Sequence, residues 1–101
     1  MKLIELNLQK IFDLCRKHRV RTLSVFGSIL TEKFNSDSDV DMLVDFDPVD
    51  HETFDYVDNY FGLRDALEVL FSRKVDLVEE KGLRNRYLIA NINRTKRLIY
   101  G

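Results

Sequence analysis

The sequence predicts a mixed α/β fold, in which one small sheet is covered by helices. Residues 3–18 and 53–71 carry apolar side chains at spacings of three and four, which is typical of helices with one buried stripe. Residues 39–46 have an apolar residue at every second position, which is the period of a strand. Because helical and strand patterns follow one another along the chain, we expect a single mixed sheet with helices packed on it.

The size and charge of the chain limit what it can do. With 101 residues there is room for one compact domain, which we expect to span residues 1–101. A hydrophobic fraction of 45% and a charged fraction of 33% are typical of a folded globular protein. The net charge is -1, so the chain lacks an overall basic surface for DNA or an anionic membrane. We therefore expect neither of them as a partner.

Nothing in the sequence predicts export or insertion into a membrane. The first ten residues mix acids and amides with apolar residues and lack the small-residue cleavage site of a signal peptide. No apolar run approaches the roughly eighteen residues of a membrane span. The single Cys15 cannot form an intramolecular disulfide, which fits a reducing compartment, and we expect a buried, inert thiol. The expected location is the cytoplasm.

The first third of the chain predicts a helix, a strand and a second, shorter helix. In residues 3–18 the stripe consists of Leu3, Ile4, Leu8, Ile11, Phe12 and Cys15. Residues 20–26 are rich in β-branched and aromatic side chains and end at Gly27, which predicts a strand. Residues 29–33 fit a short helix that has Ser28 near its N-terminus.

The clearest strand is residues 39–46. One face carries Val40, Met42, Val44 and Phe46, and the other carries Asp39, Asp41, Leu43 and Asp45. Pro48 ends the strand, because proline cannot donate a hydrogen bond to the ladder. Asp45 and Asp47 are expected to be solvated, since Asp45 lies about 13 Å along the strand from Asp41.

The rest of the chain predicts two helices and two strands. Residues 53–71 form a long helix, although Gly62 inside it costs about 1 kcal/mol. Residues 74–78 alternate again and predict a strand, and residues 83–91 have a helical pattern. Residues 97–100 fit a short strand or sheet edge.

The acidic residues indicate a metal site. Residues i and i+2 of a strand point the same way with Cα atoms roughly 6.5 Å apart, so the carboxylates of Asp39 and Asp41 can share an ion. Without a cation they would repel and raise each other's pKa. Oxygen ligands suit Mg²⁺, which takes one or two protein carboxylates and completes its octahedron with water and phosphate oxygens. If residues 74–78 lie beside this strand, Asp76 adds a third carboxylate, for a second ion or to accept a proton.

A phosphate site is predicted next to these acids. Gly27 lets the backbone approach a ligand closely, and Ser28 is expected where a helix N-terminus offers free N–H groups. A triphosphate cradle beside a metal site is what phosphoryl transfer requires, because that chemistry depends on positioning and on neutralising charge.

Two other interpretations of these residues are weaker. Residues 37–41 resemble the start of a calcium loop, but Met42 stands where a glycine is needed and Pro48 where a glutamate is needed. His18 is expected at a helix end and His51 in a loop, and neither is expected to bind a metal.

Three motifs, taken together, resemble a known family. They are Ser24-Val25-Phe26-Gly27-Ser28, Ser38-Asp39-Val40-Asp41-Met42-Leu43-Val44 and Arg73-Lys74-Val75-Asp76-Leu77-Val78. Their order and spacing are similar to the DNA polymerase β nucleotidyltransferase superfamily, and the short chain is similar to its minimal, or MNT, branch. The resemblance covers nearly the whole sequence and implies the polymerase β-like nucleotidyltransferase fold.

The resemblance also implies an activity and a partner. It assigns triphosphate binding to Gly27 and Ser28, and catalysis and metal binding to Asp39, Asp41 and Asp76, with ATP as the substrate and two Mg²⁺ ions possible. Many such proteins are MntA-like antitoxins encoded with HEPN-domain ribonuclease toxins, and they are implied to transfer AMP to a toxin tyrosine. The expected partner is therefore a HEPN-type toxin, in a hetero-oligomer, and a homo-oligomer is an alternative.

One position departs from the family pattern. Relatives often carry an arginine directly after the glycine-serine pair, where its charge helps to hold phosphate, and here the residue is Ile29. Lys33, Arg73 and Lys74 are the candidates for that charge. Two alternatives stay open: an antitoxin that neutralises its toxin by binding without catalysis, and a nucleotidyltransferase that acts on a small molecule.

Overall fold

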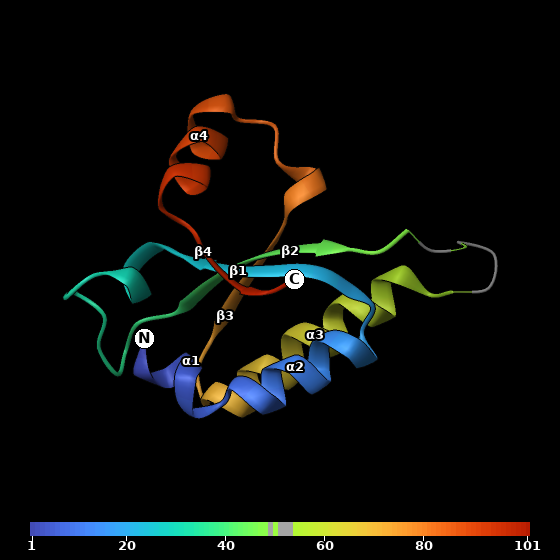
Figure 1. Ribbon diagram of the computed structural model, residues 1–101, viewed down its shortest axis with the longest axis horizontal. Coiled ribbons are helices and arrows are strands. Elements are labelled where there is room, and N and C mark those ends of the chain that lie inside the picture. The colour runs from blue at the N-terminus through green and yellow to red at the C-terminus, as the bar shows by residue number, and fades with distance from the viewer. Residues whose placement is uncertain (49, 51–53) are drawn as a thin grey trace.

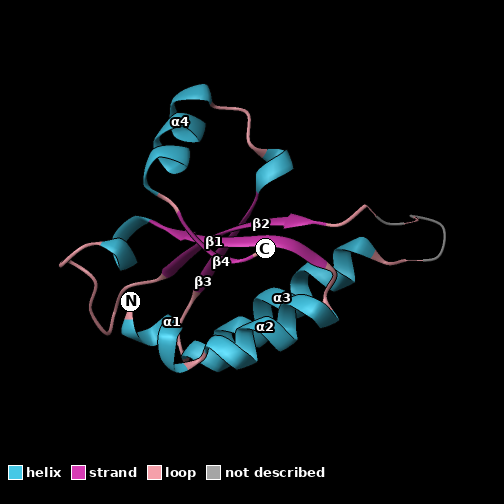
Figure 2. Cartoon of the chain, viewed as in Figure 1, coloured by secondary structure: helices cyan, strands magenta, loops and turns pink. Residues whose placement is uncertain are grey.

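The computed structural model describes residues 1–48, 50 and 54–101 (Figure 1). Its elements are the helices α1 (Lys2–Leu6), α2 (Leu8–Lys17), α3 (Tyr56–Phe71) and α4 (Arg86–Thr95), the 3-10 helices η1 (Gly27–Leu30) and η2 (Glu80–Gly82), and the strands β1 (Val20–Phe26), β2 (Val40–Phe46), β3 (Val75–Glu79) and β4 (Arg97–Tyr100). Figure 2 shows how helices and strands alternate along the chain.

The strands form one mixed sheet in the order β3-β2-β1-β4. β1 pairs antiparallel with both β2 and β4, and β2 pairs parallel with β3. A parallel pair needs a crossover connection, which α3 supplies between β2 and β3. The predicted mixed sheet is confirmed, and residues 97–100 form β4, which is one of its two edge strands.

Helices cover the two faces of the sheet differently. Figure 1 shows α1, α2 and α3 on one face, whereas α4 stands on the other. The first face holds the hydrophobic core, in which Val40, Met42 and Val44 of β2 are fully buried. Because side chains alternate along a strand, Asp41 points to the opposite face, where α4 stands. Leu43 shares that second face and is also buried, at 4% exposure.

The predicted N-terminal helix over residues 3–18 is divided into two. Asn7 interrupts it with φ -115° and ψ 11°, and its Nδ2 donates a hydrogen bond to the Leu3 carbonyl at 2.8 Å. An asparagine side chain competes in this way for backbone groups that would otherwise continue the helix. The apolar stripe survives the break, because Ile4 of α1 and Ile11 of α2 are both buried in the core.

Capping side chains set the other helix ends. Asp55 is the N-cap of α3 and accepts a hydrogen bond from the Asp58 amide, so the helix begins at Tyr56. The predicted start of this helix, residue 53, lies outside the described residues. Asn85 accepts from the amides of Tyr87 and Leu88, so α4 begins three residues later than the predicted residue 83. The predicted end of that helix at residue 91 was four residues short.

Gly62 is explained by the packing of α2 against α3. A Cβ at Gly62 would lie 3.2 Å from the Cε1 atom of His18, so a larger residue would require the imidazole to shift by a few tenths of an ångström. His18 Nδ1 and Asn59 Oδ1 are 3.1 Å apart, and Asn59 Nδ2 donates to the His18 carbonyl at 2.7 Å. His18 is therefore a packing residue at the end of α2, and His51 lies outside the described residues.

Side chains of α3 satisfy the open edge of β3. The Val75 amide donates to Glu68 Oε2 at 3.0 Å, and the Tyr60 hydroxyl donates to the Leu77 carbonyl. An edge strand with free backbone groups is a template for unwanted pairing, and these two bonds satisfy two of the backbone groups of β3. They also fix β3, and with it Asp76, against α3.

Two further expectations concern Cys15 and the membrane. Cys15 is fully buried, and burial raises the pKa of its thiol to about 12, as expected for an inert side chain. Among the described residues, no helix has both the length and the apolar character needed to cross a membrane.

Candidate active site

The sheet brings two of the predicted acids side by side. In the parallel pairing of β2 and β3, Asp41 lies directly opposite Asp76. Asp39 directly precedes β2 and is exposed. The sequence predicts a third carboxylate from Asp76 only if residues 74–78 lie beside the strand of residues 39–46. In the sheet, β3 and β2 are indeed neighbours.

The electrostatics of Asp41 reflect this arrangement. Burial raises the pKa of the Asp41 carboxyl most, and the carboxylates of Asp76 and Asp39 raise it further. All three effects disfavour the charged form of Asp41. A cation bound between these acids would reverse the balance, because it favours every carboxylate in its charged form.

Gly27 closes tightly on the same carboxylate. Phe26 pairs with Asp41 across β1 and β2, and the next residue, Gly27, turns the chain with φ +76°. A Cβ at Gly27 would lie 3.3 Å from Asp41 Cγ and closer still to its Oδ2. Only glycine adopts this conformation without strain, so the predicted close approach of the backbone at Gly27 is present.

The segment after Gly27 differs from the predicted short helix over residues 29–33. It is the four-residue 3-10 helix η1, which begins at Gly27 and ends at Leu30. Thr31 closes it, because its amide and its hydroxyl both donate to the Ser28 carbonyl, at 2.9 and 2.8 Å. So short a 3-10 helix has little dipole, and the case for phosphate binding at Ser28 rests instead on its place directly after Gly27, which packs against Asp41.

Arg73 holds the loop that leads into Asp39. Its Nη1 donates to the carbonyls of Asn35 and Ser38, at 2.9 and 3.0 Å, and its Cζ lies 4.8 Å from the centre of the Phe34 ring. The guanidinium is therefore committed to the loop, which makes Arg73 a poor source of the charge that Ile29 lacks. Ile29 itself is buried in the core, at 5% exposure.

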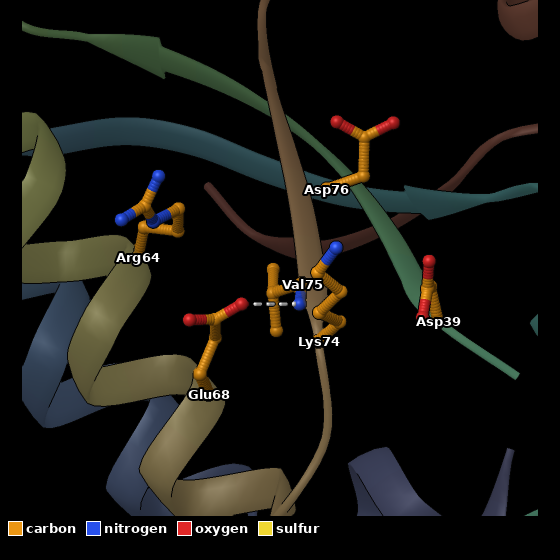
Figure 3. A pocket seen from close by; sticks show the side chains of 6 residues that line it. All are labelled: Asp39, Arg64, Glu68, Lys74, Val75 and Asp76. Carbon is orange, nitrogen blue, oxygen red and sulfur yellow. Dashed lines mark hydrogen bonds between the residues drawn. The ribbon is translucent and has the colours of Figure 1, made fainter. Parts of the chain in front are cut away.

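A charged cavity of about 360 Å³ lies beside β3, next to Asp39 and Asp76 (Figure 3). It is lined by Asp39, Arg64, Glu68, Lys74, Val75 and Asp76. Lys74 makes no ion pair within the described residues, so its ammonium group is available to an anion. Among the candidates for the missing charge, Lys74 is thus placed next to Asp39 and Asp76.

The sequence did not identify Arg64 and Glu68 as members of this cavity. Both belong to α3, where i and i+4 residues share a face, and that face is turned toward β3. Arg64 also contacts Asp65 at 3.0 Å and lies 4.7 Å over the Phe61 ring. The helical spacing of an arginine and a glutamate was visible in the sequence, but which strand they face depends on the packing.

Asp45 differs from its expected solvated state. Its side chain is only 12% exposed, and it lies 3.5 Å from Lys81 Nζ and 3.9 Å from Arg21 Nη1. Asp47 is exposed, as expected, and pairs with Arg21 Nε at 3.5 Å. Asp45 is therefore half-buried and lies beside two cations, one of them Lys81 of η2.

The donor set fits magnesium. Within the described part of the chain, no three carboxylate, imidazole or thiol side chains already converge closely enough to hold an ion by themselves. Mg²⁺ needs only one or two protein carboxylates and takes its other ligands from water and phosphate. Asp39 and Asp41, with Asp76 opposite, provide all-oxygen ligands without a competing histidine or thiolate, and their role as ligands stays a prediction.

Comparison with protein families and curated proteins gives consistent matches. A family model described as a nucleotidyltransferase domain matches residues 8–99. A Methanocaldococcus jannaschii protein, provisionally described as a protein adenylyltransferase, is 35% identical over an alignment of 93 residues that covers 84% of this chain and 90% of the relative. The protein adenylyltransferase MntA of Thermococcus cleftensis is 34% identical over 73 residues, 72% of this chain and 69% of the relative.

Solved structures share the fold. A provisionally identified minimal nucleotidyltransferase matches with a TM-score of 0.74 and 29% identity, covering 95% of this chain and 92% of that chain. A tri-AMPylated Shewanella oneidensis HEPN toxin in complex with an MNT antitoxin matches with a TM-score of 0.66, covering 96% of this chain and 71% of that chain. At 22% identity the second likeness shows the fold alone. The predicted fold class is confirmed.

Proposed function

Because the chain belongs to the nucleotidyltransferase domain family, we propose that it moves AMP from ATP onto the hydroxyl group of an acceptor. The chain is a nucleotidyltransferase. The proposal for the reaction rests on one observation, which is that Asp41 lies directly beside both Asp76 and the Gly27 turn. Triphosphate and metal would then meet at a single carboxylate.

Asp39 and Asp41 would hold Mg²⁺, with Asp76 as a further ligand when a second ion binds. The raised pKa of Asp41 supports this assignment: burial raises it most, and Asp76 and Asp39 raise it further by a repulsion that a cation would relieve. Bound magnesium would neutralise the negative charge on the phosphate oxygens that develops during transfer.

The residues of the chain then have separate roles in one displacement. Gly27 and Ser28 bind the triphosphate, with the Gly27 backbone close to Asp41. The acceptor oxygen forms a bond to the α-phosphorus as the bond from that phosphorus to the bridging oxygen breaks, and pyrophosphate leaves. Asp76, which lines the charged cavity, accepts the proton of the acceptor hydroxyl when it does not hold a second ion.

The proposed acceptor is a tyrosine of a HEPN-type ribonuclease toxin, which the chain would silence as an antitoxin. Two observations support this partner: a relative that is 34% identical is a protein adenylyltransferase named MntA, and the fold is that of an MNT antitoxin found with an AMPylated HEPN toxin. In this scheme the toxin would bring the acceptor into a hetero-oligomer, so the small chain would need no acceptor domain of its own.

A second candidate is an antitoxin that neutralises its toxin by binding alone. The observation that favours it is Ile29, which is buried in the core and offers no charge to phosphate. The two candidates separate in cells that express the toxin. If the Asp39→Asn variant protects such cells as well as the native chain, binding is sufficient; if protection is lost, transfer is required.

Transfer itself is tested by incubating the chain with α-labelled ATP, Mg²⁺ and proteins of the host lysate. We expect a discrete labelled protein with the native chain and none with Asp39→Asn. Asp37→Asn is the matched control, because Asp37 is an exposed acid in the preceding loop, and it should leave the label unchanged. Equal labelling by native chain and Asp39→Asn would contradict the proposed role of Asp39.

A further inference from the structure

We infer that a cavity between α4 and η2 binds a side chain of the acceptor protein that lies close in sequence to the acceptor tyrosine. This inference rests on the proposed function and adds to it a second point of contact with the acceptor. The cavity has a volume of about 410 Å³, its floor is formed by the sheet, and α4 and η2 supply its walls. Figure 1 shows α4 and the short helix η2 on the same side of the sheet.

The cavity lies along the strand that carries the proposed metal ligand. Its floor includes Leu43 and Asp45 of β2, together with Ser24 of β1, which pairs with Leu43. On β2, Leu43 and Asp45 follow Asp41 on the same face, with Cα atoms about 6.5 and about 13 Å away. An extended chain covers about 13 Å in about four residues. A protein segment whose tyrosine reaches Asp41 and Asp76 can therefore place a neighbouring side chain in this cavity.

The floor of the cavity holds polar atoms without hydrogen-bond partners. Ser24 is only 4% exposed, and among the described residues its hydroxyl has no partner. Asp45 Oδ1 is also buried and accepts no hydrogen bond within the described part of the chain, although Lys81 Nζ lies 3.5 Å away. A buried polar atom without a partner is costly, and native structures normally supply one. Both groups therefore indicate a ligand that enters the cavity and donates a hydrogen bond.

The charges around the cavity are already paired, which favours a neutral ligand. Asp45 lies 3.5 Å from Lys81 and 3.9 Å from Arg21, and Glu80 lies 3.6 Å from Lys96. A further charge of either sign would lose its hydration without gaining a partner of its own. A neutral N–H or O–H group satisfies the free acceptor atoms without this cost.

Apolar surface at the cavity favours a ligand with an apolar stem. Leu43 lies in the floor, and Leu98 of β4, which pairs with Ser24, also lines the cavity and is 58% exposed. A stem that covers these two side chains removes apolar surface from water. The donor at its end then meets Ser24 and Asp45 Oδ1. The chemical class is therefore a neutral side chain with a hydrogen-bond donor on an apolar stem, as in glutamine.

The test measures the kinetics of AMP transfer from α-labelled ATP to a purified HEPN-type toxin. Asp45→Ala removes the acceptor atom, and Leu98→Asn removes apolar surface at an exposed position, where a polar side chain is compatible with the fold. We expect each variant to raise the KM for the toxin about tenfold and to leave kcat and the KM for ATP unchanged, because only binding of the acceptor is weakened.

Asp47→Ala is the matched control, because Asp47 also pairs with Arg21 but does not line the cavity. It should change none of these constants. An unchanged KM for the toxin in either cavity variant, or a lower kcat at unchanged KM, would overturn the inference and leave the proposed function intact. Failure of the native chain to transfer the label to the toxin would overturn both.

A second measurement tests the chemical class of the ligand. Neutral donor side chains of the toxin within about four residues of the labelled tyrosine are replaced by alanine, one at a time. One replacement should raise the KM with the native chain and raise it no further with Asp45→Ala, because that contact is already lost. Effects that add for every replacement would contradict a direct contact with Asp45.

Discussion

Asp41 is in an unfavourable electrostatic position in the absence of a cation. Its pKa is raised above 3.8 by burial and by Asp76 and Asp39, so the folded state resists its ionisation more than the unfolded state does. Below pH 3.8 the carboxyl is protonated in both states and the effect disappears. As the pH rises through the raised pKa, the folded state becomes less stable than it would be without this acid.

The Asp41→Asn variant should therefore be more stable than the native chain at pH 7. Because the side chain is partly exposed, solvent screening keeps the expected gain in free energy of unfolding small, at about 0.5 kcal/mol. Urea unfolding at pH 7 and at pH 3 measures it, and the gain should vanish at pH 3. A variant that is less stable than the native chain at pH 7 would show that Asp41 is held by favourable contacts instead.

Gly27→Ala should damage both fold and site. The added methyl group meets the Asp41 carboxylate, and φ +76° is a strained conformation for alanine, so we expect a loss of about 1–3 kcal/mol in the free energy of unfolding. Gly82→Ala is the control, since a Cβ there would have only ordinary contact with Glu79, at 3.8 Å. Chemical denaturation of both variants measures the difference, and equal stabilities would contradict the close approach at Gly27.

At the scale of elements, the loop of residues 34–38 depends on Arg73. Arg73→Ala removes two hydrogen bonds from one charged group and the contact with Phe34, so we expect a loss of about 1–3 kcal/mol in the free energy of unfolding. Faster hydrogen exchange of the Ser38 amide, which donates to Asn35, should accompany it.

Arg84 provides the control for Arg73. Its Nη1 also donates to two carbonyls, those of Lys81 and Leu83, but it is exposed and lies in the segment after η2. Arg84→Ala should leave the Ser38 amide unchanged. If the two variants behave alike, the loop before Asp39 does not need the guanidinium of Arg73.

The edge of β3 is held by the Tyr60 hydroxyl. Tyr60→Phe leaves the Leu77 carbonyl without this donor, and we expect a loss of about 1 kcal/mol in the free energy of unfolding. Tyr87→Phe removes a hydroxyl from a tyrosine that is 81% exposed, and it should be neutral. Thermal unfolding of the two variants gives the comparison, and an unchanged midpoint for Tyr60→Phe would mean that water replaces the hydroxyl.

Strands were easier to predict from the sequence than helix ends. The alternation in residues 39–46 predicts a strand with one buried face, whatever element packs on that face. The observed strand β2 covers Val40–Phe46. Helix ends depend on single side chains that satisfy backbone groups, so Asn7 divided one predicted helix and Asn85 delayed another. The alternation correctly predicts that Leu43 lies on the acidic face. It does not predict that Leu43 is buried, because that depends on the elements packed over this face.

At the scale of the molecule, the acids of the site could be predicted and their surroundings could not. The i, i+2 spacing of Asp39 and Asp41 predicts that they point the same way, and in the structure Asp41 lies in β2 while Asp39 directly precedes it. Their position opposite Asp76 requires β2 and β3 to be parallel neighbours, which is a contact between distant parts of the chain. Arg64 and Glu68 enter the charged cavity only through the packing of α3, and the cavity between α4 and η2 exists only because α4 stands on the open face of the sheet.

The most direct test of the central claim is to locate the label after reaction with ATP labelled at either the α- or the γ-phosphate. The native chain, Mg²⁺ and a purified HEPN-type toxin are incubated with each nucleotide, with Asp41→Asn in parallel. The account predicts that the α-label alone reaches the toxin, that the γ-label leaves as pyrophosphate, and that Asp41→Asn transfers neither. Transfer of the γ-label, or undiminished transfer of the α-label by Asp41→Asn, would contradict it.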